Sequence, residues 1–344
     1  MKSNLTTLCY IEKDDAWLMM HRTKKENDIN KDKWIGVGGH FEPDESPDEC
    51  LLREVREETG LTLSSYQLRG IITFSTNTWP TEYMFLYTAT TESEDFISCD
   101  EGELVWVSKS KVNSLNLWEG DKIFFRLLEE REDMFSLKLT YHDDTLISAI
   151  LDGIPMELFE ILNPDGTFSG RTSERNIVHA TGALHATSHV WLIRPNEASG
   201  YDILLQERCA TKESYPGCYD ISSAGHIPYS EDYVTSALRE LEEELGIVAT
   251  AEELHFIGTH QNESKEIFHG KLFWNHEYSH VYLYLCNEEP IFHLQEEEVA
   301  SVRWMDLEDC IQAVTKGSIP NCIFLKELNL IKESLDMRDS GNYN

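Results

Sequence analysis

Apolar residues in the first half of the chain come in short runs separated by charged or turn-forming residues. Runs at 5–11 and 16–20 flank the charged sequence EKDD, a pattern typical of a β-hairpin. A longer run at 117–130 has the spacing of a helix. Further short runs predict strands at 68–75, 83–89, 104–107, 136–141 and 145–151. Strands mixed with helices in this way predict an α/β domain of ordinary size.

The second half repeats this arrangement. Apolar stretches at 179–193 and 201–209 flank a turn, strands are predicted at 254–260, 278–286 and 299–305, and helices at 306–315 and 323–335. Between the halves, turn-forming residues such as those of NPDGTFSG predict a linker and lead-in segment at 153–170. We therefore expect one domain at 1–152 and a second at 171–340.

One predicted helix carries a distinctive set of acids. Its apolar side chains recur at helical spacing: Leu51, Leu52 and Val55. Glu54, Glu57 and Glu58 then fall at positions i, i+3 and i+4 and share one face. Carboxylates this close repel one another unless a cation binds or one of them takes up a proton. Because Mg²⁺ prefers oxygen ligands and bridges carboxylates to phosphates, the segment predicts a divalent metal site.

The segment around this helix occurs twice. The chain reads GHFEPDESPDECLLREVREETGL from residue 39 and GHIPYSEDYVTSALRELEEELGI from residue 225. Both copies fit G-x5-E-x7-R-E-U-x-E-E-x-G-U, where U is apolar, and two matches at this many fixed positions exclude coincidence. In the second copy Glu240, Glu243 and Glu244 repeat the acidic triplet.

This repeated pattern resembles the signature, or box, of the Nudix hydrolase family. The resemblance implies two tandem Nudix folds, each a mixed β-sheet sandwiched between α-helices. It also implies hydrolysis of a phosphoanhydride in a nucleoside diphosphate linked to a group X. Structural pairs would form within each box, Glu45 with Arg53 and Glu231 with Arg239. The helix glutamates and the Gly38 carbonyl would bind Mg²⁺ or Mn²⁺, and the expected catalytic residues are Glu57, Glu58, Glu243 and Glu244.

The first half resembles a narrower group, the MutT-type 8-oxo-dGTP diphosphatases, in KWIGVGGHFEPDES, LWEGD and FSLKLTYHDDTL. The resemblance implies that Trp118 stacks on a purine and that Asp121 hydrogen-bonds it, with Trp34 as a further substrate-binding candidate. Packing of Trp118 in the core is an equally good interpretation of the sequence. Ile35 stands where the related enzymes usually carry Asn, so a preference for oxidised purines does not follow.

The second half resembles the isopentenyl-diphosphate-isomerase-like branch of the superfamily in its VH…LH start, its K-x3-PG-x-YD loop and its AGH sequence. That resemblance implies metal binding through His226, His185 and Glu277, although strand histidines commonly have a structural role. We keep His226 and Glu277 as candidate site residues. Ala224 stands where isomerases have a catalytic Cys, and Cys218 lies six residues too early to replace it. These departures favour hydrolysis, with isomerisation or a non-catalytic nucleotide sensor as alternatives.

Charge and composition narrow the partners. The 344 residues include 29 basic and 62 acidic side chains, a net charge of −33, which disfavours nucleic acids and anionic membranes. We expect a small phosphoanhydride substrate, such as a nucleotide, that is bound through cations. Eight scattered cysteines without a CxxC pair predict reduced thiols, and the lack of a signal peptide or transmembrane run predicts a cytoplasmic protein. Acids outside the boxes are further candidate ligands or bases: Glu101, Glu103 and Glu296 to Glu298.

Overall fold

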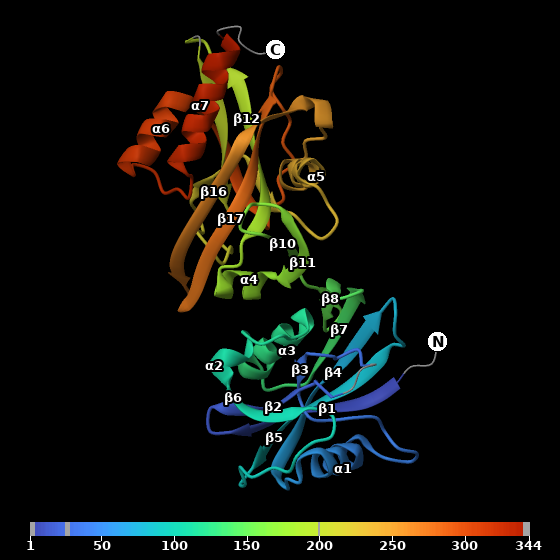
Figure 1. The fold of residues 1–344 in the computed structure, drawn as a ribbon. Coiled ribbons are helices and arrows are strands. Elements are labelled where there is room, and N and C mark those ends of the chain that lie inside the picture. The colour runs from blue at the N-terminus through green and yellow to red at the C-terminus, as the bar shows by residue number, and fades with distance from the viewer. Residues whose placement is uncertain (1–3, 25–27, 199, 340–344) are drawn as a thin grey trace. The chain divides into compact units, whose positions relative to one another are not determined.

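The computed structural model describes residues 4–24, 28–198 and 200–339, and they form two compact units (Figure 1). The first unit runs to Leu158 and includes Thr172–Ile177, and the second comprises Phe159–Arg171 and the chain from Val178 onward. Each unit is built around a nine-stranded sheet. Within the described residues, every helix is too short or too polar to cross a membrane.

The sheet of the first unit has the strand order β3-β2-β1-β5-β4-β7-β8-β9, with β6 paired to β2. Strands β1 and β5, and β4 and β7, run parallel, whereas β1 and β2 and the β4–β5 pair are antiparallel, so the sheet is mixed as predicted. Its elements are β1 (Asn4–Lys13), β2 (Ala16–His21), β3 (Trp34–Ile35), β4 (Leu63–Thr76), β5 (Glu82–Thr91), β6 (Glu103–Ser108), the short helix α2 (Lys109–Val112), β7 (Phe135–His142), β8 (Thr145–Leu151) and β9 (Ile154–Pro155).

Alternating side chains of β1 contact helices on both faces of this sheet. Cys9 and Ile11 belong to the core beneath α1 (Pro47–Thr59), and Tyr10 belongs to the core beneath α3 (Glu119–Glu130). Successive strand side chains point to opposite faces, so one strand contributes to two cores. Full burial of side chains of this size stabilises the fold by about 1.5–3 kcal/mol each. Figure 1 shows the resulting helix–sheet–helix layers.

Helix α1 begins at Pro47, four residues before Leu51, where the predicted helical pattern of apolar residues starts. The Ser46 side chain accepts a hydrogen bond from the Glu49 backbone N–H, and the Glu49 carboxylate accepts one from the Ser46 N–H at 2.8 Å. Pro47 occupies the first helical position, where its missing N–H costs no hydrogen bond. The helix ends at Thr59, and Gly60 caps it with a φ of 71°, which suits glycine. Ser46, Pro47 and Glu49 are close together in the sequence, but the start of the helix was missed because only the periodicity of apolar residues was used.

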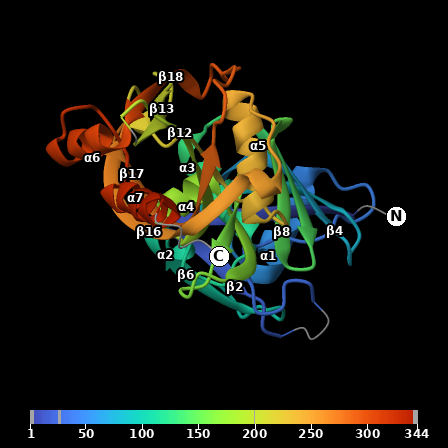
Figure 2. The same cartoon turned by 90° about the horizontal axis from the view of Figure 1, so that it is seen from above.

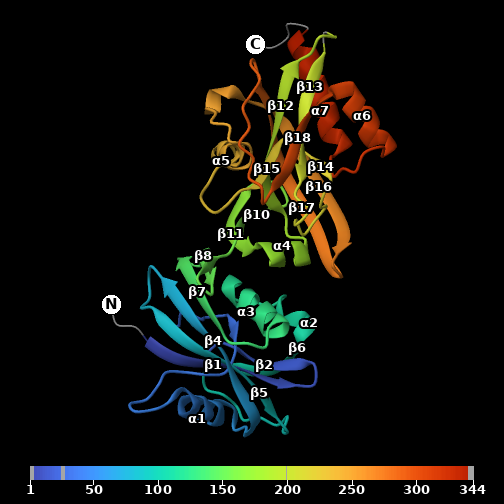
Figure 3. The same cartoon turned by 180° about the vertical axis from the view of Figure 1, so that it is seen from behind.

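The sheet of the second unit follows the same plan. Strands β12 (His185–Pro195) and β17 (Lys271–Leu285) are parallel, as β1 and β5 are in the first unit. Figures 2 and 3 show α5 (Tyr233–Leu245) on one side of this sheet, and α6 (Leu307–Lys316) with α7 (Leu325–Asp339) on the other. The remaining elements are β10 (Leu158–Leu162), β11 (Phe168–Glu174), α4 (Arg175–Thr181), β13 (Tyr201–Arg208), β14 (Tyr219–Asp220), β15 (Ser223–His226), a 3₁₀ turn (Ala251–Glu253), β16 (Leu254–Phe268) and β18 (Val299–Asp306).

The segment at 153–170, expected to be a linker, is largely structured. All five residues of β10 are buried, and the turn residues of NPDGTFSG form the loop between β10 and β11. The predicted start of the second domain at 171 also differs from the structure, because Thr172–Ile177 group with the first unit. The Thr172 hydroxyl donates to the Leu146 carbonyl, and Ile177 joins the first unit's core.

Candidate active sites

Arg53 is the centre of the first box. Its Nε and Nη2 donate hydrogen bonds to the two carboxylate oxygens of Glu45, at 2.6 and 2.9 Å. Its Nη1 donates to Glu54 at 2.7 Å and lies 3.4 Å from Glu57. Hydrogen bonds from Arg53 lower the pKa of Glu45 to about 2. The guanidinium therefore fixes the loop acid against the helix and holds two of the three helix acids together.

The second box repeats this arrangement. Arg239 Nη1 lies 2.9 Å from Glu240 and 3.0 Å from Glu243, and its Nε lies 3.4 Å from Glu231. Glu231 also accepts a hydrogen bond from the Ser236 hydroxyl at 2.8 Å. Both predicted Glu–Arg pairs are thus in contact, with longer distances in the second box.

The third glutamate of each triplet is buried against a backbone amide. Glu58 is 8% exposed and accepts a hydrogen bond from the Gly38 N–H at 3.0 Å. Glu244 is 6% exposed and accepts one from the Ala224 N–H at 3.2 Å. Burial raises the pKa of each carboxyl to about 8. A buried carboxyl beside two others is a donor set that fits a divalent cation, which would replace the proton.

The box glycines allow the first glutamate of each triplet to lie against the loop. A Cβ atom on Gly39 would lie 2.5 Å from Glu54 Oε1, and one on Gly225 would lie 2.1 Å from Glu240 Oε1. Any side chain at these positions would displace a carboxylate, so the glycine requirement follows from the close approach.

A cavity of about 440 Å³ in the first unit reaches the box. Its lining includes Glu54, Glu58, Glu101 and Arg22. The same cavity is lined by a group of mostly apolar residues: Leu8, Ile35, Phe74, Met84, Trp118 and Asp121. Carboxylates that can hold a cation and a slot that can hold a ring therefore border one space.

Trp118 and Asp121 are both almost completely buried beside this cavity. The Trp118 ring, 4% exposed, meets Phe74 and Tyr141 edge-to-face and carries the Lys33 ammonium 4.8 Å from its centroid. Burial raises the pKa of Asp121 to about 8, so this carboxyl holds its proton near neutral pH.

Trp34 lies elsewhere. Its ring stacks on His21 with the centroids 4.6 Å apart, and it is not among the described residues that line the cavity. Of the loop acids in the first half, Glu101 lines the cavity and pairs with Arg22, whereas Glu103 begins β6 opposite His21.

In the second half, Glu298 pairs with Lys212, and Arg208 donates to Asp220 at 2.9 Å. Both basic residues are thus paired with acids of their own unit.

Three histidines of the second unit form a further candidate metal centre. One ring nitrogen from each of His179, His185 and His226 lies within 4.8 Å of the others. The His226 ring stacks on Phe159 at 3.7 Å, and His185 Nε2 lies 3.9 Å from Glu277 Oε1. Burial, together with the neighbouring histidines, lowers the pKa of His185 well below its usual value, which favours the neutral form that binds metals. The structure therefore brings His226 and Glu277 to one centre.

His179 was missed from the sequence. It lies on α4, close to the predicted linker, and its distance from the other two histidines depends on how α4 meets β12 and β15. The six-residue spacing between His179 and His185 was the available signal.

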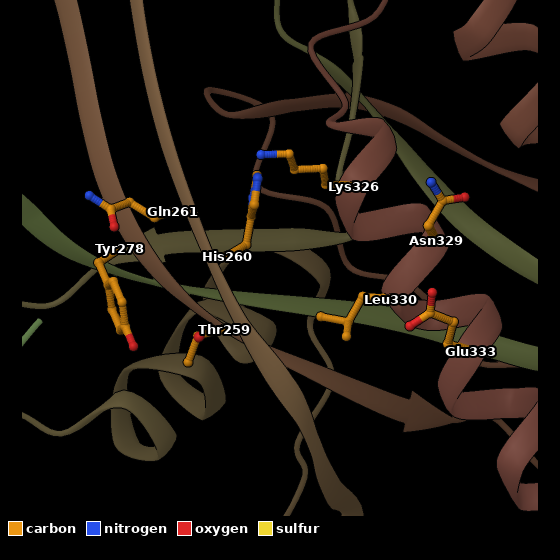
Figure 4. A pocket seen from close by; sticks show the side chains of 8 residues that line it. All are labelled: Thr259, His260, Gln261, Tyr278, Lys326, Asn329, Leu330 and Glu333. Atoms are coloured by element: carbon orange, nitrogen blue, oxygen red, sulfur yellow. The ribbon is translucent and has the colours of Figure 1, made fainter.

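The second unit has a groove of about 600 Å³ that follows β16 and α7 (Figure 4). Beside it, buried Glu327 accepts hydrogen bonds from His189 Nδ1 at 2.7 Å, His260 Nδ1 at 3.2 Å and Trp191 Nε1 at 3.0 Å. Burial opposes a charge on His189, but the Glu327 carboxylate raises its pKa to about 9. The described box glutamates do not line this groove, and the network anchors α7 to the sheet.

Comparison with known proteins agrees with this geometry. Residues 2–128 and 183–322 each match the NUDIX domain. Nudix hydrolase 3 of Arabidopsis thaliana is 36% identical over 156 residues, which is 44% of this chain and 20% of that protein. An uncharacterized Nudix hydrolase of Clostridium acetobutylicum is 33% identical over 154 residues, 44% of this chain and 71% of that protein. This chain thus spans about a fifth of the Arabidopsis protein.

Among solved structures, the MutT protein from Bacillus halodurans is 26% identical, covers 44% of this chain and 99% of its own, and has a TM-score of 0.40. Pyrophosphohydrolase activity on nucleoside diphosphate derivatives, with divalent metal ions, is general in the family of the matched domain. Because the two domain matches span more than half of the sequence, this chain belongs to the Nudix hydrolase family and carries the NUDIX domain twice.

Proposed function

We propose that each box binds Mg²⁺ through its helix glutamates and hydrolyses a phosphoanhydride bond, and that the first unit acts on purine nucleoside triphosphates. The observation that carries the proposal is the cavity of the first unit, because Glu54 and Glu58 line it together with Trp118 and Asp121. Its volume of about 440 Å³ lies in the usual range of ligand pockets.

Each residue of the box has a distinct task in this proposal. A bound divalent cation would polarise the phosphoanhydride and lower the pKa of an attacking water. Glu57, whose side chain is 61% exposed, would take the proton of that water, while Glu54 and Glu58 would bind the cation. Arg53 orients Glu54, and the Gly38 amide orients Glu58. In the second box Glu240, Glu243 and Glu244 have the corresponding tasks.

The base would bind beside Trp118. The neutral Asp121 carboxyl can both donate and accept a hydrogen bond, which suits the polar edge of a purine. Stacking of a base on an aromatic side chain is tolerant of the base's identity, so discrimination between bases must come from polar groups.

The second unit supports one alternative. The cluster of His179, His185 and His226, with Glu277 nearby, favours a metal in addition to that of the box, and isopentenyl-diphosphate isomerisation is the alternative reaction. Ala224 in place of a cysteine counts against it, because Ala supplies no proton donor. A nucleotide sensor is the other alternative, and the complete glutamate triplets of both boxes count against it.

The test uses the whole chain with one box silenced at a time. Glu57→Gln and Glu243→Gln, alone and together, are compared with the unchanged protein for phosphate or pyrophosphate release with Mg²⁺. Substrates are nucleoside triphosphates, 8-oxo-dGTP, dinucleoside polyphosphates, ADP-ribose and isopentenyl diphosphate. Hydrolysis of a purine triphosphate that is lost with Glu57→Gln is the expected result. Hydrolysis that survives the double variant would refute the assignment of both boxes.

A further inference from the structure

We propose that the second unit acts on a diphosphate whose group X is rich in hydroxyl groups, such as a sugar, and that Asn262 and Asn275 recognise those hydroxyls. The two boxes then serve different substrates. The inference rests on the proposed hydrolysis by the second box and adds the chemical class of its substrate.

The two sheets can be compared position by position, because they share an irregularity. The β4–β5 pairing shifts its register just before Gly70, and the β16–β17 pairing shifts just before Gly258. These glycines lie opposite Leu86 and Val281, respectively, and the pairs that follow run in step. Strands β1 and β12 join β5 and β17 in the same parallel alignment. Each position on this part of one sheet therefore has a counterpart on the other.

The sheet face that borders the cavity of the first unit is apolar, and its counterpart in the second unit is polar. Three apolar residues of the first sheet line the cavity: Leu8, Phe74 and Met84. Their counterparts in the second sheet are all polar: His189, Asn262 and Ser279. A polar group that is buried without a hydrogen-bond partner is unfavourable. The face in the second unit therefore suits a polar ligand rather than an apolar one.

The helix above this face differs in the same sense. The Asp121 N–H donates to the Trp118 carbonyl and the Glu327 N–H donates to the Phe324 carbonyl, both at 3.0 Å, so the two acids are counterparts. Glu327 accepts three hydrogen bonds from side chains of its own unit. Burial opposes its ionisation, but its histidine partners lower its pKa to about 2. Glu327 is therefore engaged in holding α7 to the sheet, and a ligand must find its partners elsewhere on the face.

Two amides on neighbouring strands are such partners. Asn262 Nδ2 is a buried donor and Asn275 Oδ1 is a buried acceptor, and neither has a hydrogen-bond partner among the residues that the structure describes. Asn262 lies opposite Glu277, and Asn275 lies opposite Ser264. These four side chains share one face, because they are two residues apart along each strand. Buried polar atoms are nearly always hydrogen-bonded, so the two amides point to polar atoms of a ligand.

The amides belong to the same sheet as the second box. Asn262 on β16 lies opposite Glu277 on β17, which lies opposite His185 on β12. Strand β12 in turn pairs with β15, whose Gly225 lies against Glu240 of the box. A substrate whose phosphoanhydride is held at the box can therefore extend its group X over β12 and β17 towards the amides.

Hydroxyl groups fit these amides better than any other common group X. A hydroxyl can accept a hydrogen bond from Asn262 and donate one to Asn275 or to the Glu277 carboxylate. A sugar carries several hydroxyls in fixed positions and can meet all three residues at once. An isopentenyl chain has no polar atom and would leave the amides unpaired, which is the situation that gives strong rejection of the wrong ligand.

The experiment compares ADP-ribose with the hexyl ester of ADP, which differ only in whether group X is a sugar or an apolar chain. The full chain carries Glu57→Gln so that only the second box turns over. Water attacks one phosphorus and the bridging oxygen leaves with the other phosphate, so ADP-ribose yields AMP and ribose 5-phosphate. We expect kcat/KM for ADP-ribose to exceed that for the hexyl ester by at least about tenfold.

Matched variants test the two amides. Asn262→Leu gives β16 an apolar residue where the first sheet has Phe74, and it should lower the preference for ADP-ribose at least about tenfold. Asn275→Leu should act in the same direction, even if Asn262→Leu fails to fold. Gln261→Leu is the control, because Gln261 is exposed and its side chain points to the opposite face of β16. It removes an amide from the same strand and should leave the preference unchanged.

Equilibrium binding of both esters to the Glu57→Gln/Glu243→Gln double variant separates this inference from the proposed activity. Selective binding of ADP-ribose that depends on Asn262 or Asn275, without hydrolysis, would refute the activity of the second box and support the recognition of hydroxyls. Hydrolysis that needs Glu243 would refute the inference alone in either of two cases: no preference for ADP-ribose in the unchanged site, or a preference that both Asn variants retain. A lack of both binding and hydrolysis would refute both.

Discussion

Arg53 and Glu45 form a two-pronged ion pair, with Nε and Nη2 of the arginine each bonded to a different oxygen of the glutamate, at 2.6 and 2.9 Å. The corresponding Arg239 lies 3.4 Å from Glu231 through its Nε. Bidentate pairs fix the geometry of both partners. The first box is therefore held more tightly for metal binding than the second.

Removal of these arginines should weaken metal binding unequally. We expect Arg53→Ala to lower the Mg²⁺ affinity of the first box by about 10- to 100-fold, as found for groups that orient metal ligands, and Arg239→Ala to cost the second box less. The measurement is the Mg²⁺ dependence of turnover with the other box silenced. Arg56→Ala is the control, because Arg56 lies on the same helix but bonds Gly60 and Thr62. Equal losses in the two boxes would contradict the ranking.

Glu57→Gln should abolish turnover by the first box while the fold persists. The Glu57 side chain is largely exposed, so the neutral amide has little effect on packing. Loss of a general base lowers rates by about 10²- to 10⁴-fold. Steady-state kinetics and thermal unfolding of the full chain check this, with Glu129→Gln on the exposed part of α3 as a charge-matched control. A variant that loses activity only because it unfolds would count against the catalytic role.

Without metal, Glu58 should make the protein less stable as the pH rises. Burial raises its pKa to about 8 in the folded state, from 4.5 in the unfolded chain. Between these values the folded state holds a proton that the unfolded state has released, so stability falls by up to about 1.4 kcal/mol per pH unit. Denaturation in EDTA at pH 5 and pH 8 should show a smaller loss for Glu58→Gln than for the unchanged protein. Parallel losses would mean that Glu58 ionises freely in the fold.

The histidine cluster should bind a transition metal that the boxes do not need. Imidazole ligands suit Zn²⁺ and Co²⁺, so we expect His185→Gln and His226→Gln each to remove one bound Co²⁺ per chain. Calorimetric titration with Co²⁺ measures the stoichiometry. His255→Gln is the control because His255 is exposed on β16. An unchanged stoichiometry in both variants would show that the cluster holds no metal.

Local patterns predicted most of the fold. The box helices follow from periodicity and from their terminal glycines, although the Ser46 cap was missed, and the alternation of Cys9, Tyr10 and Ile11 sets the two cores of the first unit. All eight cysteines are free, as their spacing indicated. The prediction was too short for β16 and β17, because their paired residues 261–277 are mostly polar and lack an apolar alternation.

Features of the sites that depend on contacts between distant residues could not be predicted from the sequence. The Asn30–Trp118 hydrogen bond joins residues 88 positions apart, and the contact between His179 and His226 needs α4 and β15 to meet. No spacing rule brings such pairs together. By contrast, the acids within each box were predictable because one helix and the loop before it carry them all.

The path of the chain has a practical consequence for dissecting this protein. It passes from one unit to the other at 158/159, again at 171/172 and finally at 177/178. No single cut of the polypeptide can therefore release two complete units. A fragment ending at residue 152 lacks Thr172–Ile177, and a fragment starting at 171 lacks buried β10. Inactivity of either fragment would report the missing piece, so the activities of the two boxes are best separated by point substitutions in the intact polypeptide.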